Sequence, residues 1–427
     1  MERKEYPELS ETLWQTTLPN GLPVRVLRRP GFTKKIAYMI VDFGAIHRKF
    51  TLDGELYEVP AGIAHYLEHK LFDMPGGRDV MAEFARFGAN PNAFTGYDAT
   101  AYYFSCTENF ESCLRLLLEY VSTPYFTEET VKKEQGIIGQ EIDMHADNAD
   151  SRSFEELMKN MYRSHPVSVP ILGDRDSIAR ITPELLTLCH RAFYRPRNMI
   201  LCVVGDVDPE QVAEIACQLL PETDDAQVTR EESWPEEMTC PRAFGEHSME
   251  VSMPMFQLGF KSEPPERGEA AVRAELVGDL ASEALFGESS ALYLRLYEEG
   301  LIDNSFGGCF DTMDGLGVLI AGGDSEDPQA VRDAVLEEAQ RLCREGIPEE
   351  DFLRMKRSLL GRRIGGLDNM DSTIYRIGAY ALSDFDYFDF SRVCKTVERQ
   401  DIYEFLQRVI TPERCSLCII NPKEETL

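Results

Sequence analysis

The chain has 427 residues, enough for two domains of ordinary size, and 43% of them are hydrophobic, as is typical of globular proteins. Its 74 acidic residues outnumber 44 basic ones and leave a net charge of -30. Such a chain repels nucleic acid and anionic membrane surfaces, so neither is expected as a partner.

The cysteines and the N-terminus indicate a reducing compartment. The first residues are charged and lack the apolar core of an export signal, and no apolar run approaches the ~18 residues of a membrane span. The 11 cysteines are scattered, which favours free thiols and a cytoplasmic protein. Cys415 and Cys418 form a C-x-x-C pair, but the surrounding stretch predicts a buried strand, so two core cysteines are favoured over a redox or metal pair.

The first half alternates predicted strands and helices. Apolar runs bounded by turn residues predict strands at 22–29, 36–42, a pair within 92–106, and 198–207. Helical spacing of apolar residues predicts helices after the Pro60-Ala61-Gly62 break, at 79–87, 110–120, from Thr127 onward, 153–162, 183–193 and 209–219.

The second half repeats this pattern after a polar, acidic and proline-bearing stretch. We predict a first domain at 1–220, a linker at 221–247 and a second domain at 248–427. The helix at 272–287 aligns with the helix after Gly62 at an offset of 214 residues, and the closing strand CSLCIINP resembles ILCVVGDVDP. This order indicates an α+β fold of two homologous halves, each with helices packed on a mostly antiparallel sheet.

Two of the seven histidines lie four residues apart on one predicted helix, in the motif H-x-x-E-H. This spacing places His65, Glu68 and His69 on one face, one turn apart. Two neutral imidazoles bind Zn²⁺, and a carboxylate beside the metal-bound water can take its proton and later protonate the leaving amine. The flanking residues are apolar, which is wrong for a solvated helix face. The motif therefore predicts a metal site with Glu68 as the base.

The third ligand is expected from the helix that follows Thr127. Glu134 and Glu141 lie seven residues apart, two turns along one face, with the apolar GIIG between them. Carboxylates on a packed face need a partner, because burying an unpaired charge is costly. We expect Glu141 to be the third ligand and Glu134 to be an auxiliary carboxylate. The residues do not distinguish Zn²⁺ from Mn²⁺ or Co²⁺.

Three ordered motifs, AHYLEHKLF, NAFTGYDATAYYF and KKEQGIIGQEI, resemble the pitrilysin, insulysin and mitochondrial processing peptidase family of inverzincins. The resemblance implies one zinc ion per chain on His65, His69 and Glu141, with catalytic roles for Glu68 and Glu134. It also implies that Asn92, Ala93 and Thr95 bind an extended peptide by strand addition. The alternative for Asn92 is a turn residue after Gly88-Ala89.

The second half departs from the family pattern. The arginine and tyrosine that relatives use to hold substrate are missing, since Tyr297 falls in the arginine position and Asp303 lies near the tyrosine position. The repeat places Asp279, Ser282 and Glu283 where the first half has its motif. The chain is therefore most similar to the zinc-bearing subunit of bacterial two-subunit members, and a hetero- or homodimer with a related subunit is expected.

Two other functions remain open. One is a non-catalytic scaffold subunit, although the chain retains all five site residues of the family. The other is a metal-dependent hydrolase of a different substrate, although the N-A-F-T stretch favours extended peptides, among them precursor leader peptides.

Overall fold

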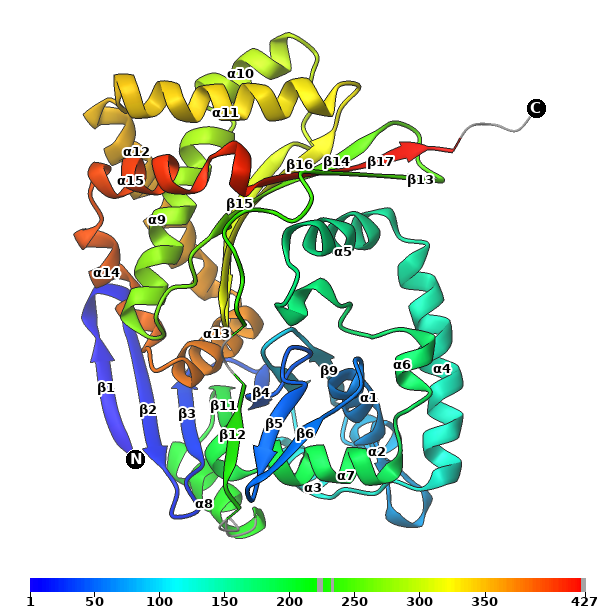
Figure 1. Cartoon of the computed structure of the whole chain (residues 1–427). Coiled ribbons are helices and arrows are strands. Elements are labelled where there is room, and N and C mark those ends of the chain that lie inside the picture. The colour runs from blue at the N-terminus through cyan, green and yellow to red at the C-terminus, as the bar shows by residue number, and fades with distance from the viewer. Residues whose placement is uncertain (221–225, 232–233, 424–427) are drawn as a thin grey trace. The chain divides into compact units, whose positions relative to one another are not determined.

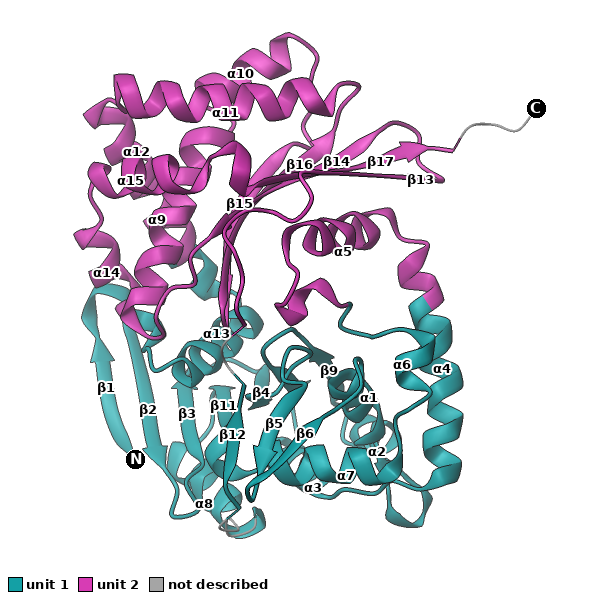
Figure 2. Ribbon diagram, in the orientation of Figure 1, with its two compact units in different colours: residues 1–142, 170–231, 364–388 teal, residues 143–169, 232–363, 389–427 magenta. Residues whose placement is uncertain are grey.

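The computed structural model describes residues 1–220, 226–231 and 234–423, which divide into two compact units (Figure 2). The first unit comprises 1–142, 170–231 and 364–388, and the second comprises 143–169, 232–363 and 389–427. The units differ from the predicted domains 1–220 and 248–427, because a segment of each half belongs to the unit of the other. Within the described residues no helix has the length and apolar character needed to cross a membrane.

The first unit is built on one large sheet (Figure 1). Its strands, in spatial order, are β1 (Glu2–Tyr6), β2 (Glu11–Thr17), β3 (Pro23–Arg28), β11 (Met199–Gly205), β4 (Lys35–Val41), β10 (Thr100–Cys106) and β9 (Asn90–Thr95). Strands β3 and β11 pair in parallel, and the other neighbours are antiparallel. The predicted strands and helices of this half are confirmed, whereas the β1–β2 pair was not predicted.

Helices cover both faces of this sheet, which explains why its central strands are apolar throughout. On β4, Met39 and Val41 join the core beneath the helices of one face. Ile40 points the other way, toward α13 (Met370–Leu382), where a Cβ on Gly378 would lie 2.4 Å from its Cδ1 atom. The other helices of the unit are α1 (Ile63–Lys70), α2 (Val80–Arg86), α3 (Phe110–Ser122), most of α4 (Glu128–Ala146), α6 (Arg175–Ile178), α7 (Pro183–Phe193) and α8 (Pro209–Leu219).

The second unit repeats this sheet. Its strands run in the order β13 (Phe244–Met249), β17 (Cys415–Pro422), β14 (Met255–Ser262), β16 (Leu316–Asp324) and β15 (Gly307–Met313). The pair β13–β17 at the end of this sheet is parallel and the rest are antiparallel, so these five strands match β3, β11, β4, β10 and β9 of the first sheet. The helices are α5 (Ala149–Met161), α9 (Glu269–Phe286), α10 (Ala291–Glu298), α11 (Pro328–Glu345), α12 (Glu349–Gly365), α14 (Phe390–Thr396) and α15 (Arg399–Val409). The predicted duplication of two halves is confirmed.

The halves exchange one helix each. Helix α5 follows α4 in the chain but packs on β14 and β17, where Gly259 lies against Met161. Helix α13 follows α12 and packs on β4 and β11. Gly259 on β14 and Gly378 on α13 leave room for this close packing. A Cβ at Gly259, for example, would lie 2.3 Å from the Met161 sulfur. The exchange is the reason that the compact units interleave along the sequence.

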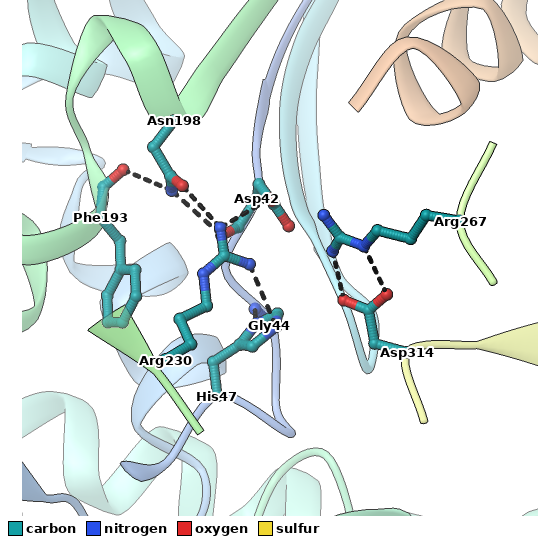
Figure 3. A network of polar contacts seen from close by, with 8 residues as sticks. All are labelled: Asp42, Gly44, His47, Phe193, Asn198, Arg230, Arg267 and Asp314. Atoms are coloured by element: carbon teal, nitrogen blue, oxygen red, sulfur yellow. Dashed lines mark hydrogen bonds and ion pairs between the residues drawn. The ribbon is translucent and has the colours of Figure 1, made fainter. Parts of the chain in front are cut away.

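Part of the predicted linker is bound to the first unit. Residues 221–225 and 232–233 of this segment lie outside the described residues, but β12 (Val228–Arg230) pairs with β5 (Lys49–Leu52), which pairs with β6 (Glu55–Glu58). Arg230 donates to Asp42 and to Asn198, each at 2.6 Å, and its guanidinium lies 5.9 Å from the ring centre of Phe193 (Figure 3).

A second part of that segment is bound to the second unit. Glu236 accepts backbone N–H bonds from Arg163 and His165 at 2.6 and 2.9 Å, and it pairs with the fully buried Lys261 at 3.2 Å. The described parts of 221–247 are therefore anchored by charged side chains, which the polar composition did not predict.

The buried His190 of α7 makes stability depend on pH. Its Nε2 atom lies 3.0 Å from the carbonyl oxygen of Val121, and its ring stacks on Tyr194. Burial lowers the pKa of His190 to about 4, a shift that the carbonyl only partly offsets. In the unfolded chain the pKa is near 6.5, so acidification protonates the unfolded state first. The contribution of neutral His190 to the free energy of unfolding is therefore complete above pH ~6.5 and decreases as the pH falls toward 4.

We predict that the metal-free wild-type chain loses up to ~3 kcal/mol more stability than the His190→Gln variant between pH 7 and pH 4.5. Denaturant unfolding at both pH values measures this difference. The exposed His145 provides a matched control, since His145→Gln should behave as the wild type. An equal loss in the wild type and His190→Gln would contradict the account.

Candidate metal centre

Helix α1 carries the H-x-x-E-H motif and is buried on almost every side. Ile63, Ala64 and Leu67 belong to the core of the first unit, and Glu68 is only 7% exposed. The helix begins after Gly62, whose φ of +86° favours glycine. A Cβ at this position would lie 2.3 Å from the carbonyl oxygen of Leu172, so no other residue fits without moving the backbone. The start of α1 is thereby fixed.

Helix α4 lies against α1 and brings the two glutamates to the histidines. The hydroxyl of Tyr66 donates to the carbonyl oxygen of Val131, which ties the two helices together. Glu141 Oε1 lies 3.5 Å from His65 Nε2, and Glu141 Oε2 lies 3.5 Å from His69 Nε2. The structure therefore places the three predicted ligands together, with ligand atoms all within 4.8 Å of one another.

This arrangement fits a small divalent cation. A tetrahedral zinc ion with bonds of roughly 2.0–2.1 Å spaces its ligand atoms about 3.3–3.4 Å apart, close to the observed separations. Two neutral imidazoles and one carboxylate are also the donor types that zinc prefers, and they leave one position open. Glu68, Glu134 and Glu141 place excess negative charge around the two histidines, which a divalent cation would neutralise.

Glu134 contacts the far side of one histidine ring. Its Oε1 atom lies 3.0 Å from His69 Nδ1, so Glu134 is positioned to orient the ring and fix its tautomer. Burial lowers the pKa of His69, but the hydrogen bond that its ring donates to Glu134 and the charges of Glu68, Glu134 and Glu141 together outweigh this effect and raise the pKa. His65 Nδ1 is buried and has no hydrogen-bond partner among the described residues, so its ring is held by packing.

Glu68 interacts with the hydroxyl groups of one threonine and three tyrosines. Thr95 Oγ1 of β9 donates to Glu68 Oε2 at 2.6 Å. Behind it lie three buried tyrosines, Tyr102, Tyr120 and Tyr194, and the hydroxyls of Tyr102 and Tyr194 are 2.7 Å apart. Burial raises the pKa of each tyrosine, and the charge of Glu68 raises each further. Sequence reasoning missed these tyrosines, which read as ordinary core aromatics.

The predicted substrate strand is β9, at one end of its sheet. Among the described residues it pairs only with β10, so its other edge carries unpaired backbone groups. Asn92 is exposed, and its side chain bonds to the Tyr103 hydroxyl and to the backbone N–H of Ala93. The role of Thr95 in binding a peptide stays a prediction, and its hydroxyl donates to Glu68.

The second half has ion pairs at the corresponding place. The segment Glu134–Glu141 of α4 matches Lys356–Arg363 of α12, with GIIG aligned to SLLG. Arg363 Nη2 lies 2.8 Å from Asp279 and 2.6 Å from Glu275, both on α9, and Arg362 pairs with Glu283 at 3.1 Å. A carboxylate thus replaces His65 and a guanidinium replaces Glu141, so these helices are linked by charge pairs.

The orienting role of Glu134 predicts a change in metal affinity. Glu134→Gln should weaken zinc binding by about 10–100-fold, because the neutral amide holds the His69 ring less firmly. Competition with a chromophoric chelator measures this affinity. Glu129→Gln, at an exposed position of the same helix, should bind zinc as the wild type does. Equal affinity in both variants would contradict the role of Glu134.

The ion pairs of the second half predict a loss of stability without a loss of metal. Arg363→Met removes the guanidinium that lies between the partly buried Asp279 and Glu275, which should cost about 1–3 kcal/mol after allowance for solvent screening. Urea unfolding measures the loss, and zinc content should stay unchanged. Arg354→Met removes a more exposed ion pair on α12, so its loss of stability should be well below that of Arg363→Met. Loss of zinc in Arg363→Met would show that the charge pairs support the metal centre.

Two family descriptions match successive parts of the chain. The family description "Insulinase (Peptidase family M16)" matches residues 53–175, which include α1 and α4, and "Peptidase M16 inactive domain" matches residues 180–359. The uncharacterized zinc protease YmfH of Bacillus subtilis (strain 168) is 39% identical over 427 residues, covering 98% of this chain and 99% of its own.

Solved structures show the same fold. A protein described as an M16-like peptidase, from Alicyclobacillus acidocaldarius, has a TM-score of 0.93 and 31% identity, covering 98% of this chain and 100% of its own. Pitrilysin has a TM-score of 0.76 at 16% identity, over 99% of this chain but 46% of its own. The likeness to pitrilysin concerns the fold alone.

Proposed function

The chain belongs to the insulinase family of M16 peptidases, and from this premise we propose that it is a zinc endopeptidase that cleaves extended peptides. One observation supports the proposal most strongly. His65, His69 and Glu141 bring their ligand atoms within 4.8 Å of one another. Glu68 lies on the same helix face as the two histidines. This is the donor set and the carboxylate that hydrolysis of an amide requires.

Each residue has a proposed task. His65, His69 and Glu141 would hold one zinc ion, which when bound polarises a carbonyl group and lowers the pKa of a neighbouring water molecule. Glu68 takes the proton of the attacking water and returns it to the leaving amine. Glu134 orients His69 through its Nδ1 atom.

The free edge of β9 suggests how a peptide is held. A substrate in extended conformation can add to this edge, so that backbone hydrogen bonds provide affinity for many sequences. Ala93 N–H already donates to the Asn92 side chain at 2.9 Å, so Asn92 must release this group when a strand is added. Binding through the backbone favours unfolded peptides over folded proteins, in keeping with short peptides or leader segments as substrates.

We further propose that a related subunit completes the catalytic site. Tyr297 falls in the position of the arginine expected from the family and Asp303 lies near that of the tyrosine, and Tyr297 is 54% exposed on α10. A homologous chain that carries this arginine and tyrosine would then supply the two side chains.

The proposal predicts that Glu68→Gln keeps the metal and loses turnover. Removing the base should lower kcat by about 10²–10⁴-fold on internally quenched peptides of about ten residues, while zinc content stays near one per chain. The chain is assayed alone and with a homologous subunit. Glu58→Gln, at an exposed position on β6, should retain full activity.

Two outcomes would contradict the proposal. Cleavage that is unchanged in Glu68→Gln would exclude this carboxylate as the base. A wild-type chain that binds zinc but cleaves none of the peptides, with or without a partner, would favour the non-catalytic scaffold subunit.

A further inference from the structure

We infer that Thr95 is a positioning residue for the base Glu68 and does not bind the substrate. The inference rests on the proposed peptidase function. In this inference the Thr95 hydroxyl on β9 holds the Glu68 carboxylate in place. The strand proposed to pair with the peptide would then also position the base.

The hydrogen-bond directions support this assignment. Thr100 Oγ1, which is fully buried, donates to the carbonyl oxygen of Phe43 at 2.8 Å. The single proton of Thr100 is therefore used there, and its contact with Thr95 Oγ1 is long, at 3.5 Å. Thr95 directs its own proton to Glu68 Oε2 at 2.6 Å, a short bond typical of an ionised acceptor.

Thr95 is also the one hydrogen-bond donor to the Glu68 side chain in the part of the chain that the structure describes. The nearby hydroxyls of Tyr102 and Tyr194 bond to each other at 2.7 Å. A carboxylate held at one oxygen only can rotate if that bond is lost. With the bond present, Oε2 is occupied and Oε1 is left to accept the proton of the water.

The register of the sheet directs the side chain of Thr95 to the face opposite that of Asn92. Thr95 pairs with Thr100 at the end of β9, and successive side chains of a strand point to opposite faces. Asn92, three residues earlier, bonds to Tyr103, whereas Thr95 bonds to Glu68 of α1. A substrate strand added in the plane of the sheet would meet the backbone of β9 and leave this hydroxyl in place.

The consequence is a coupling between substrate binding and alignment of the base. A peptide that orders β9 also orders the residue that holds Glu68. Because displacement of a catalytic group by about 1 Å can cost about 100-fold in rate, one hydroxyl is sufficient to affect turnover. The effect should therefore lie in kcat and leave KM unchanged.

Thr95→Val and Thr95→Ser test the assignment. Valine has the shape of threonine without the hydroxyl, and serine keeps the hydroxyl. For Thr95→Val we expect kcat to fall about 10–100-fold on the quenched peptides, with KM within about twofold and zinc content unchanged. Thr95→Ser should retain at least about a third of the wild-type kcat. Thr229→Val, at an exposed position of β12, is the matched control.

Crystal structures of both variants give a measurement that does not depend on activity. The Glu68 carboxylate should change its side-chain torsion in Thr95→Val and keep it in Thr95→Ser. Thermal melting of each variant shows whether the fold is retained, and the serine variant keeps the test valid if the valine variant unfolds.

Three results would overturn the inference. A raised KM with unchanged kcat in Thr95→Val would make Thr95 a substrate contact. Equal losses in the valine and serine variants would indicate strand packing alone. An unmoved Glu68 in Thr95→Val would show that other contacts hold the base. Failure of the proposed function is distinguishable, because Glu68→Gln would then match the wild type.

Discussion

The approach of Glu141 to both His65 and His69 is the contact on which the rest of the site depends. It joins two helices whose ligands lie more than 70 residues apart in the sequence. Imidazoles and carboxylates with little solvent are costly to bury unless they have partners. Gly62 fixes the start of α1, and the hydrogen bond from the Tyr66 hydroxyl to the Val131 carbonyl ties α1 to α4. The polar groups are thus held ready for a cation.

The duplicated halves share one architecture but carry different side chains at corresponding positions of their helices. The five strands of the second sheet follow the order of β3, β11, β4, β10 and β9 in the first sheet, and the parallel pair is at the same place in that order. In the first half the equivalent helices bring His65, His69 and Glu141 together, whereas in the second half Arg363 lies between Asp279 and Glu275. Charge pairs therefore link the helices of the second half where the first half has its candidate metal ligands.

Much of the fold could be predicted, because local patterns report local structure. The helical spacing of His65 and His69, and of Glu134 and Glu141, indicated which side chains would meet before any tertiary contact was known. The apolar strand at 199–205 and its counterpart at 415–422 predicted the duplicated sheets. These signals depend on side-chain period and not on the path of the chain.

What escaped prediction depends on tertiary placement. The exchange of α5 and α13 was missed, because two similar sheets accept an apolar helix face equally well and periodicity does not say which sheet receives it. Arg230 and Glu236 anchor a segment whose polar composition predicted a linker, since composition does not reveal a partner such as Asp42 or Lys261. The bond from Thr95 to Glu68 likewise depends on how β9 meets α1.

The central claim is that His65, His69 and Glu141 together bind one zinc ion. X-ray absorption at the zinc edge, on chain loaded with one equivalent of metal, tests it most directly. The account predicts nitrogen and oxygen neighbours at about 2.0–2.2 Å, including two imidazoles, and loss of one imidazole in His65→Ala. Sulfur neighbours near 2.3 Å, or a spectrum that His65→Ala leaves unchanged, would place the metal elsewhere and contradict the account.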